Sequence, residues 1–416
     1  MKDVKFFDGG YGRGTISVSK LNSPVIYSEM LKTIRYIEKH KGIGVLTIDF
    51  DKVYDKSYPN CLVPVSGLLD YFKKNENIHI KVRKLRNSYL NRTQFVNSPV
   101  ITKSQISSNN SSVFDKVWKF SNPKETKLIS DYVFNEILNN ISCQAGVLNA
   151  ISWCINEVMD NVLRHSKVNF GFFMCQHHVH TNRLAFAIYD YGIGFYNSLY
   201  SSYRPRNYEQ AIQLAITEKV TSDKVDGRGF GLYGLHQIIK LNQGTLNISS
   251  MSSTYIYRNE GRIRDQYFSN SNYISPQAGT VLIDFQIDYT NKTDIMRVLP
   301  GGPYEQFEML LESLEDQNGA IQYKLSDYAE STGNRKSGLP IRNQLINIYN
   351  ERSSWILIDF EGIKYIASSF ADEVFGKLIV QVGEKNFGNR FRLKNLSNEL
   401  RGIISFSLND RINKKS

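Results

Sequence analysis

The sequence predicts a multidomain α/β protein, and three observations lead to that prediction. The chain has 416 residues, which is too long for one small core, so two or three domains are expected. Over residues 1–100, short apolar runs alternate with helical patterns in β–α–β order. Over residues 121–288, helical segments lead into strands and then into glycine-containing turns, the order expected of a second α/β domain that holds a ligand.

The composition is ordinary for a folded globular protein, with 41% hydrophobic and 22% charged residues. No segment approaches the roughly 18 uninterrupted apolar residues of a membrane span, and the N-terminus opens no apolar run of the signal-peptide kind. The cysteines lie far apart without a CxxC pair, so we expect reduced core residues of a cytoplasmic protein rather than a zinc site. They are Cys61, Cys143, Cys154 and Cys175.

The formal net charge is +11, and part of it gathers between Lys81 and Arg86, with Arg92 beyond. Such a basic cluster could bind nucleic acid or another polyanion. The simpler interpretation is a solvated strand end and loop, because no recognised nucleic-acid motif accompanies the cluster. Charge alone therefore leaves a nucleic-acid partner open.

An N-terminal α/β lobe is predicted over residues 1–100. It begins with a glycine-rich stretch, and the elements expected after that stretch are a helix around Ser28–His40, a buried strand at Val45–Phe50, a helix at Pro64–Lys74 and a strand at Ile78–Val82. Residues 101–120 are polar and predict a linker or exposed loop.

Two helices are expected next, at Glu125–Asn140 and from Gly146 onward. The second helix places Glu157, Asn161 and His165 at i, i+4 and i+8, on one face. The three residues could be only the solvated side of the helix. They also suit metal–phosphate chemistry, because Asn161 offers Mg²⁺ a neutral oxygen and Glu157 could orient or deprotonate a water. His165 would lie near the phosphates or cap the helix.

Two strands follow, at Phe170–Cys175 and Arg183–Tyr189. Three histidines lie between them, at positions 177, 178 and 180, and indicate a hairpin turn more simply than a metal site. The second strand leads to Asp190, whose carboxylate can accept a hydrogen bond from an exocyclic amine and so select adenine. Gly192 and Gly194 allow a tight turn against a flat ligand. Alone, this motif would be a turn with a capping Asp.

A glycine-rich turn follows a helix at Tyr208–Glu218 and opens another helix at Leu232–Leu241. Glycine amides at a helix N-terminus form an anion-binding site, and the loop is expected to act as a lid over a triphosphate. The residues of this predicted lid are Lys219, Lys224, Gly227, Arg228, Gly229, Gly231 and Leu232. The expected sheet continues through Thr245–Ser250, Thr254–Arg258 and Gly279–Ile287, with an insertion at Asn259–Gln277.

Residues 121–288 resemble the GHKL ATPases, the group of histidine kinases, type II topoisomerase and Hsp90 ATPase domains, MutL and anti-sigma-factor kinases. Glu157 with Asn161 and His165 matches the N box. The later boxes match Asp190–Gly194 (DxGxG), Gly227–Leu232 (GxGxGL) and Gly279-Thr280. The resemblance implies a Bergerat fold, an α/β sandwich with a mixed sheet. It also implies ATP with Mg²⁺ held by Asn161, and adenine read by Asp190.

A second resemblance covers residues 304–416, beyond an expected linker at 289–303. A buried strand at Trp355–Ile363 is followed by a helix that opens near Ala367, where Ser368 or Ser369 is the expected N-cap. Asp372 and Glu373 in its first turn suit the helix dipole. With Gly333-Asn334-Arg335 and a strand at Phe391–Leu393, this part resembles the STAS-like domain of unknown function often fused to GHKL modules. The N-terminal lobe is expected to be a weaker relative.

The resemblances leave several functions open. The first is a cytoplasmic ATP- and Mg²⁺-dependent regulatory protein whose nucleotide state controls a protein partner, bound through the STAS-like domain, or its own dimerisation. Glu157 would be the general base of an ATPase. A serine/threonine kinase of the anti-sigma-factor type would instead phosphorylate Ser368, although the Asp and Gly that flank the family's serine are absent here. The third is a non-catalytic ATP-dependent interaction module, for instance in phage defence.

Overall fold

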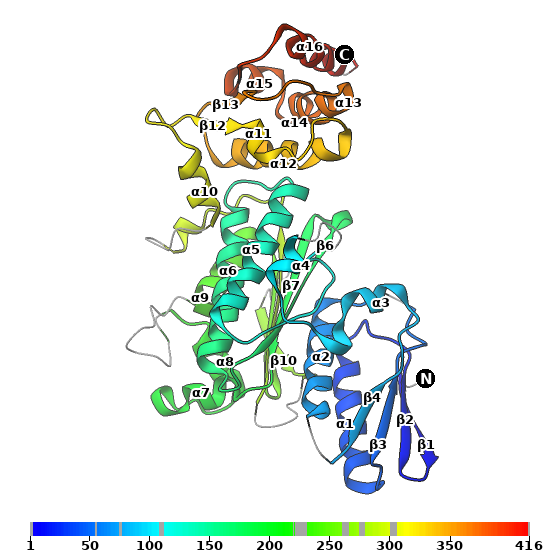
Figure 1. The fold of residues 1–416 in the computed structure, drawn as a ribbon. Coiled ribbons are helices and arrows are strands. Elements are labelled where there is room, and N and C mark those ends of the chain that lie inside the picture. Colours follow the sequence, from blue (N-terminus) through cyan, green and yellow to red (C-terminus); the bar gives the residue numbers. More distant parts are fainter. Residues whose placement is uncertain are drawn as a thin grey trace. The chain divides into compact units, whose positions relative to one another are not determined.

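The computed structural model describes residues 3–54, 56–74, 77–107, 112–218, 220, 231–259, 266–273, 279–299 and 306–414. Over these residues the chain is a multidomain α/β protein (Figure 1). It divides into two compact units, Met1–Tyr132 with Cys154–Asp288, and Val133–Trp153 with Tyr289–Ser416. The sequence prediction instead kept 121–288 together. In the described part of the chain, no helix has the length and apolarity that crossing a bilayer requires.

The N-terminal lobe contains a four-stranded sheet in the order β1-β2-β3-β4. Its strands are β1 (Val4–Gly10), β2 (Arg13–Val18), β3 (Val45–Asp49) and β4 (His79–Val82). β1 is antiparallel to β2, and the other pairs are parallel. The helices α1 (Val25–His40) and α2 (Pro59–Lys73) connect the parallel strands, so the predicted β–α–β order is confirmed. The glycine-rich start proves to be the β1–β2 hairpin, with positive φ at Gly10 and Gly12.

A seven-stranded sheet forms the larger layer of this unit, in the order β10-β9-β8-β11-β7-β6-β5. Its strands are β5 (Trp118–Phe120), β6 (Gly171–His178), β7 (Arg183–Asp190), β8 (Thr245–Ser250), β9 (Ser253–Arg258), β10 (Gln266–Asn270) and β11 (Val281–Asp288). Every pairing between these strands is antiparallel, so the expected mixed sheet is wrong for this layer. Trp118 and Phe120 are fully buried, so the expected linker at 101–120 ends inside the sheet.

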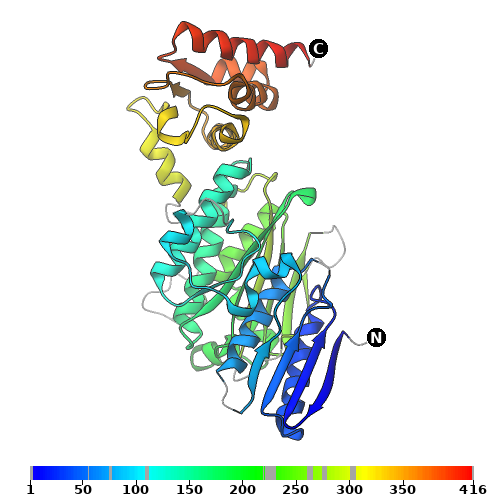
Figure 2. The ribbon, with the colours of Figure 1, turned by 45° about the vertical axis from the view of Figure 1, so that its right-hand side comes forward.

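Helices cover both faces of the seven-stranded sheet (Figures 1 and 2). α9 (Gly231–Asn242) packs on β8 and β11 on one face, and α2 packs on β6, β7 and β11 on the other. Smaller helices are α3 (Ser88–Thr93), α4 (Lys103–Ser107), α7 (Gly194–Tyr203) and α8 (Tyr208–Ala215). α5 (Pro123–Asn140) and α6 (Val147–His165) each begin in one unit and end in the other.

The packing of α2 on the sheet depends on the absence of a side chain at Gly67. A Cβ atom added there would lie 2.3 Å from the Tyr189 ring. Tyr189 is fully buried and belongs to the same apolar core as Leu62, Leu69 and Phe172. The ring therefore has no room to move away, and the contact fixes the N-terminal lobe to the strand that ends at Asp190.

Gly67→Ala is therefore expected to lower the free energy of unfolding by about 1–3 kcal/mol, because the new methyl group overpacks a closed core. The matched control is Gly402→Ala in α16 (Asn398–Asn413), where an added Cβ meets nothing within 4 Å. That change should raise stability by about 0.5–1 kcal/mol through helix propensity. Denaturant unfolding checks both, and an equal effect of the two substitutions would contradict the packing described.

The second unit contains a parallel three-stranded sheet in the order β12-β13-β14. Its elements are β12 (Ile321–Lys324), β13 (Ile356–Asp359), β14 (Phe391–Lys394), α10 (Gln306–Leu314), α11 (Leu325–Tyr328), α12 (Arg335–Glu351), α13 (Ser368–Ala371), a π-helical turn at Asp372–Gly376, α14 (Lys377–Val382), α15 (Glu384–Arg390) and α16. The strands run through the sheet in sequential order, as β2, β3 and β4 do in the N-terminal lobe.

The helix after β13 begins one or two residues earlier than an N-cap at Ser368 or Ser369 would place it. Ala367 is its N-cap, without a side-chain cap bond, so the expected capping by Ser368 or Ser369 is wrong. Both serines are exposed. The two acidic residues that follow form ion pairs: Asp372 with Arg335 and Arg411, and Glu373 with Arg342 and Lys377.

Polar side chains of α12 hold the connection between α5 and α6. Asn347 is 2% exposed; its Nδ2 donates to Leu138 O at 3.2 Å and to Ile141 O at 3.0 Å, and its Oδ1 accepts from Cys143 N at 2.6 Å. The same connection is bound by Asn343, Gln344, Asn350 and Glu351. These bonds explain why residues 133–153 group with the C-terminal part of the chain.

Candidate functional site

The α6 helix brings two of the predicted site residues to the start of α9. A Cβ atom added at Gly231 would lie 3.3 Å from Asn161 Nδ2 and 3.4 Å from Glu157 Oε2. The apolar stripe on the opposite side of α6 is buried, which turns the Glu157–Asn161 face toward α9. A backbone glycine, a carboxylate and an amide thus share one small space, although the two segments are about 70 positions apart in sequence.

Asp190 ends β7 and is 3% exposed. Its Oδ1 accepts a hydrogen bond from Gly192 N at 2.8 Å, while no described donor is shown for Oδ2. Burial raises the pKa of Asp190 to about 7, and the Gly192 bond opposes that rise. A buried carboxylate with one committed oxygen can accept one further hydrogen bond from a ligand.

The turn after Asp190 is held by α6 and by β8. Ile193 N donates to Ser166 O at 3.0 Å, just past the end of α6, and Phe195 N donates to Ser250 Oγ at 3.3 Å. A Cβ atom added at Gly192 would lie 2.1 Å from Ser166 O, so only glycine fits there. The turn can therefore approach the helix end closely.

The start of β11 completes this side of the site. Gly194 has φ +72°, and a Cβ added there would lie 3.5 Å from Thr280 O. Gly279 packs against the backbone of Ile193, because a Cβ atom added at Gly279 would lie 2.3 Å from the Ile193 carbonyl carbon. Thr280 itself is fully buried, and its Oγ1 donates to Tyr273 O at 2.9 Å. The Gly-Thr pair thus supports the turn.

The remaining predicted site residues divide into two groups. His165 is the last residue of α6, and Leu232 is buried in the first turn of α9. Lys219, Lys224, Gly227, Arg228 and Gly229 lie outside the described residues. The structure therefore brings Glu157 and Asn161 to Gly231 and, just past the end of α6, the turn after Asp190 to Ser166 and Thr280.

The N-terminal lobe supports the same region from the opposite face of the sheet, which the sequence did not predict. The hydroxyls of Tyr27 and Tyr189 are hydrogen-bonded at 2.9 Å. Asp70 accepts from the Tyr191 hydroxyl at 3.0 Å and from Lys119 at 2.9 Å. Burial would raise the pKa of Asp70, but its ion pairs with Lys74 and Lys119 outweigh this and keep the pKa below its usual value. The lobe thus positions the residues on both sides of Asp190.

The three histidines of the predicted hairpin turn belong to no cluster of three or more potential metal ligands within the described ranges. His177 and His178 lie in β6, and burial lowers the pKa of each. His178 Nε2 donates a hydrogen bond to Gln176 Oε1 at 3.1 Å. All four cysteines are buried, and none of them forms a disulfide bond.

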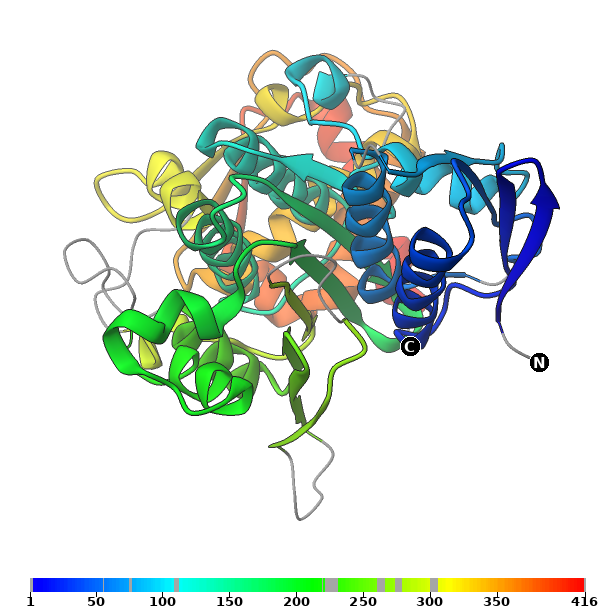
Figure 3. The same cartoon turned by 90° about the horizontal axis from the view of Figure 1, so that it is seen from below.

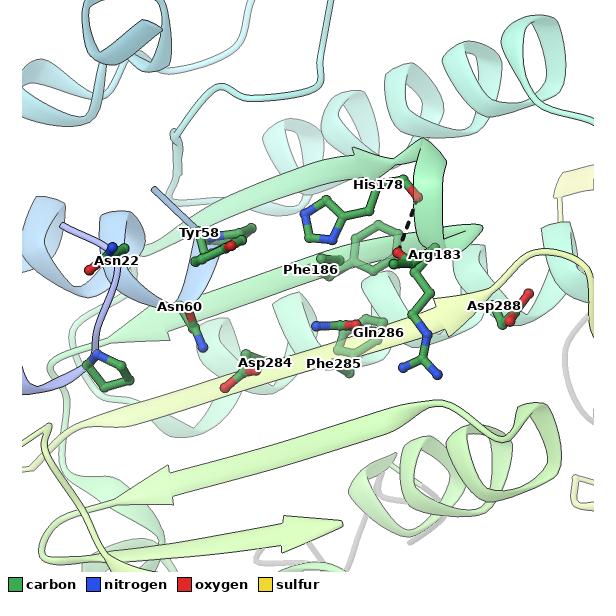
Figure 4. A pocket seen from close by; sticks show the side chains of 14 residues that line it. Asn22, Tyr58, Asn60, His178, Arg183, Phe186, Asp284, Phe285, Gln286 and Asp288 are labelled. Atoms are coloured by element: carbon green, nitrogen blue, oxygen red, sulfur yellow. Dashed lines mark hydrogen bonds between the residues drawn. The ribbon is translucent and has the colours of Figure 1, made fainter. Parts of the chain in front are cut away.

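A cavity of about 630 Å³ lies elsewhere on the sheet, beside the start of α2 (Figure 4). None of the predicted site residues lines it. Its polar walls include Asp284, which Asn247 Nδ2 contacts at 2.8 Å and 2.9 Å and whose pKa burial raises to about 6. Arg183 and Gln286 also line it. The alternation of polar residues along β11 is the sequence feature from which a polar wall at this place could have been predicted.

One family model matches part of the chain. It is described as a STAS-like domain of unknown function (DUF4325), and it covers residues 337–401, from α12 into α16. No curated protein gives a significant match to the chain. The C-terminal part therefore contains a STAS-like domain, as the sequence predicted.

Proposed function

We propose that residues 121–288 bind ATP with Mg²⁺ in the manner of the GHKL ATPases. The observation that carries the proposal is the meeting of separated motifs. Glu157 and Asn161 lie against Gly231, and the Asp190–Gly194 turn lies against Ser166 and Thr280. The antiparallel sheet departs from the mixed sheet of that family, so the proposal rests on the side chains and turns, not on strand direction.

Each motif residue has a chemical role in this proposal. Asp190 Oδ2 accepts a hydrogen bond from the exocyclic amine of adenine, while Oδ1 keeps the hydrogen bond that Gly192 N donates. Asn161 supplies an oxygen to Mg²⁺, a cation that prefers hard oxygen ligands beside phosphates. Glu157, one turn earlier, orients or deprotonates the attacking water. Backbone amides at the start of α9 bind phosphate oxygens, since a helix N-terminus attracts anions.

The output we propose is regulation of a protein partner, or of self-association, through the STAS-like domain. α12, at the start of that domain, binds the connection that leads into α6. α6 then continues as one helix to Glu157 and Asn161. A change at the nucleotide that moves α6 would therefore reach the residues that α12 holds. Sizing the protein with and without ATP distinguishes partner regulation from dimerisation.

Phosphotransfer to Ser368 is the second candidate, favoured by one observation. Ser368 is exposed at the start of α13 and does not cap the helix, so its hydroxyl is accessible to a kinase site. Asp372, four residues later, is already neutralised by Arg335 and Arg411. Added phosphate charge at Ser368 would therefore meet little repulsion from that carboxylate.

The fate of the γ-phosphate separates these functions. With γ-labelled ATP, we expect free phosphate from the wild type and about a 100-fold or greater loss of it in Glu157→Gln, with ATP binding retained. Protein-bound label that disappears in Ser368→Ala would establish the kinase. Ser369→Ala is the matched control. ATP binding with neither free phosphate nor labelled protein would establish a binding module. Phosphate release that Glu157→Gln leaves unchanged would contradict the role given to that carboxylate.

A further inference from the structure

The outer face of the N-terminal sheet is uncovered in the described structure. Figures 1 and 3 show α1 and α2 between the two sheets of this unit, so both helices lie on the same face of β1–β4. Side chains toward the helices are buried, as at Ile16, Leu46 and Ile80. A sheet of parallel strands is usually covered on both faces, so an uncovered face on β2–β4 requires a reason.

The register identifies which side chains share this outer face. One row across the sheet is Phe7, Thr15, Thr47 and Lys81; a second is Lys5, Ser17 and Asp49; a third is Arg13, Val45 and His79. The hydroxyl and Val side chains are half-buried, whereas the cations and Phe7 project. Strand spacing makes a four-strand row roughly 14 Å wide, enough for two or three nucleotides.

The charge on the face is positive. Within the described residues, no carboxylate forms an ion pair with Lys5, Arg13 or Lys81, and the acid on the face, Asp49, is paired with Arg83 at 2.6 Å. Residues 1–100 contain 17 Lys and Arg against 9 Asp and Glu, so this lobe holds +8 of the chain's +11. A polyanion is therefore the complementary partner.

Exposed aromatic rings narrow the class of polyanion. Phe7 is 52% exposed in the middle of β1, and Tyr11 is fully exposed at the tip of the β1–β2 hairpin. Aromatic rings on an open, basic sheet offer stacking surfaces to unpaired bases, while the cations bind the phosphates. In a duplex the bases are already paired and stacked, so exposed rings on a sheet favour an unpaired strand. We infer that the outer face of β1–β4 binds single-stranded nucleic acid.

The inference is tested by fluorescence anisotropy of the full-length protein with a labelled oligouridylate of about 12 nucleotides. We expect binding at low salt, weakened about 10-fold in Phe7→Ala because a stacking ring is lost. Lys81→Gln should weaken binding and lower the salt slope by about 0.7, the value for one phosphate contact to a single strand. The matched charge control is Lys364→Gln, on an exposed lysine of the other unit.

Three results would overturn the inference. They are no binding at low salt, binding that Phe7→Ala leaves unchanged, and equal competition by polyglutamate or anionic vesicles. Thermal unfolding of each variant excludes loss of the fold, since Phe7 and Lys81 are exposed and should tolerate substitution. These results do not depend on ATP, so failure here leaves the nucleotide site untouched.

Discussion

Asp190→Asn is expected to weaken ATP binding while making the protein more stable at pH 8. The amide keeps the bond to Gly192 N through its own oxygen, which leaves its NH₂ group facing the amine of adenine. Two donors then oppose each other in a buried site. We expect ATP affinity to fall by roughly 10- to 100-fold or more, measured by calorimetric titration.

The stability change follows from the raised pKa of Asp190. A carboxyl with a folded pKa of about 7 is favoured as the neutral acid, so its contribution is fully present below the unfolded value and is lost as pH rises through 7. The asparagine does not ionise. The variant should therefore gain up to about 4 kcal/mol over the wild type at pH 8, and the gain should vanish near pH 4.

Asp284→Asn is the matched control for this prediction. Asp284 is also buried in the same sheet, with a pKa raised to about 6, but it lies outside the predicted nucleotide site. Asp284→Asn should therefore also gain stability at pH 8, but less than Asp190→Asn does. Its ATP affinity should be unchanged. Equal loss of ATP binding in both variants would contradict the specific role given to Asp190.

Asn347→Ala should cause the largest loss of stability in the second unit, about 3–5 kcal/mol. Asn347 satisfies three backbone groups at the α5–α6 connection, and alanine would leave all three buried without their partner. Lys336→Ala, on an exposed position of the same helix, should change stability by no more than about 0.5 kcal/mol.

Chemical denaturation monitored by hydrogen exchange of residues 133–153 measures this effect locally. In Asn347→Ala we expect these amides to lose protection together with those of α12. If protection of residues 133–153 persisted while α12 opened, the connection would not belong to the C-terminal unit, and the proposed link from the STAS-like domain to α6 would fail.

Local patterns predicted the elements of the site well. The apolar stripe of α6 and the apolar run of β7 are enough to place Glu157, Asn161 and Asp190 on their elements. These signals are local, because a helix or strand with one buried face repeats its apolar residues at a fixed period. The C-terminal strand β13 was predicted for the same reason.

Features that depend on distant contacts were not predictable in this way. β5 is three residues long, and its burial comes from pairing with β6, more than 50 positions later. The N-terminal lobe packs on the sheet through Gly67 and Tyr189, whose complementarity leaves no local pattern. The direction of strand pairing also depends on the order of strands in the sheet, which periodicity does not specify.

The central claim is that this chain holds ATP at the meeting point of α6, the Asp190 turn and Gly231. Titrating the full-length protein with ATP, and separately with GTP, in the presence and absence of Mg²⁺ tests it most directly. We expect saturable, one-to-one binding of ATP that strengthens with Mg²⁺, loses that strengthening in Asn161→Ala, and discriminates against GTP. Absence of ATP binding in the folded wild type, or equal binding of GTP, would contradict it.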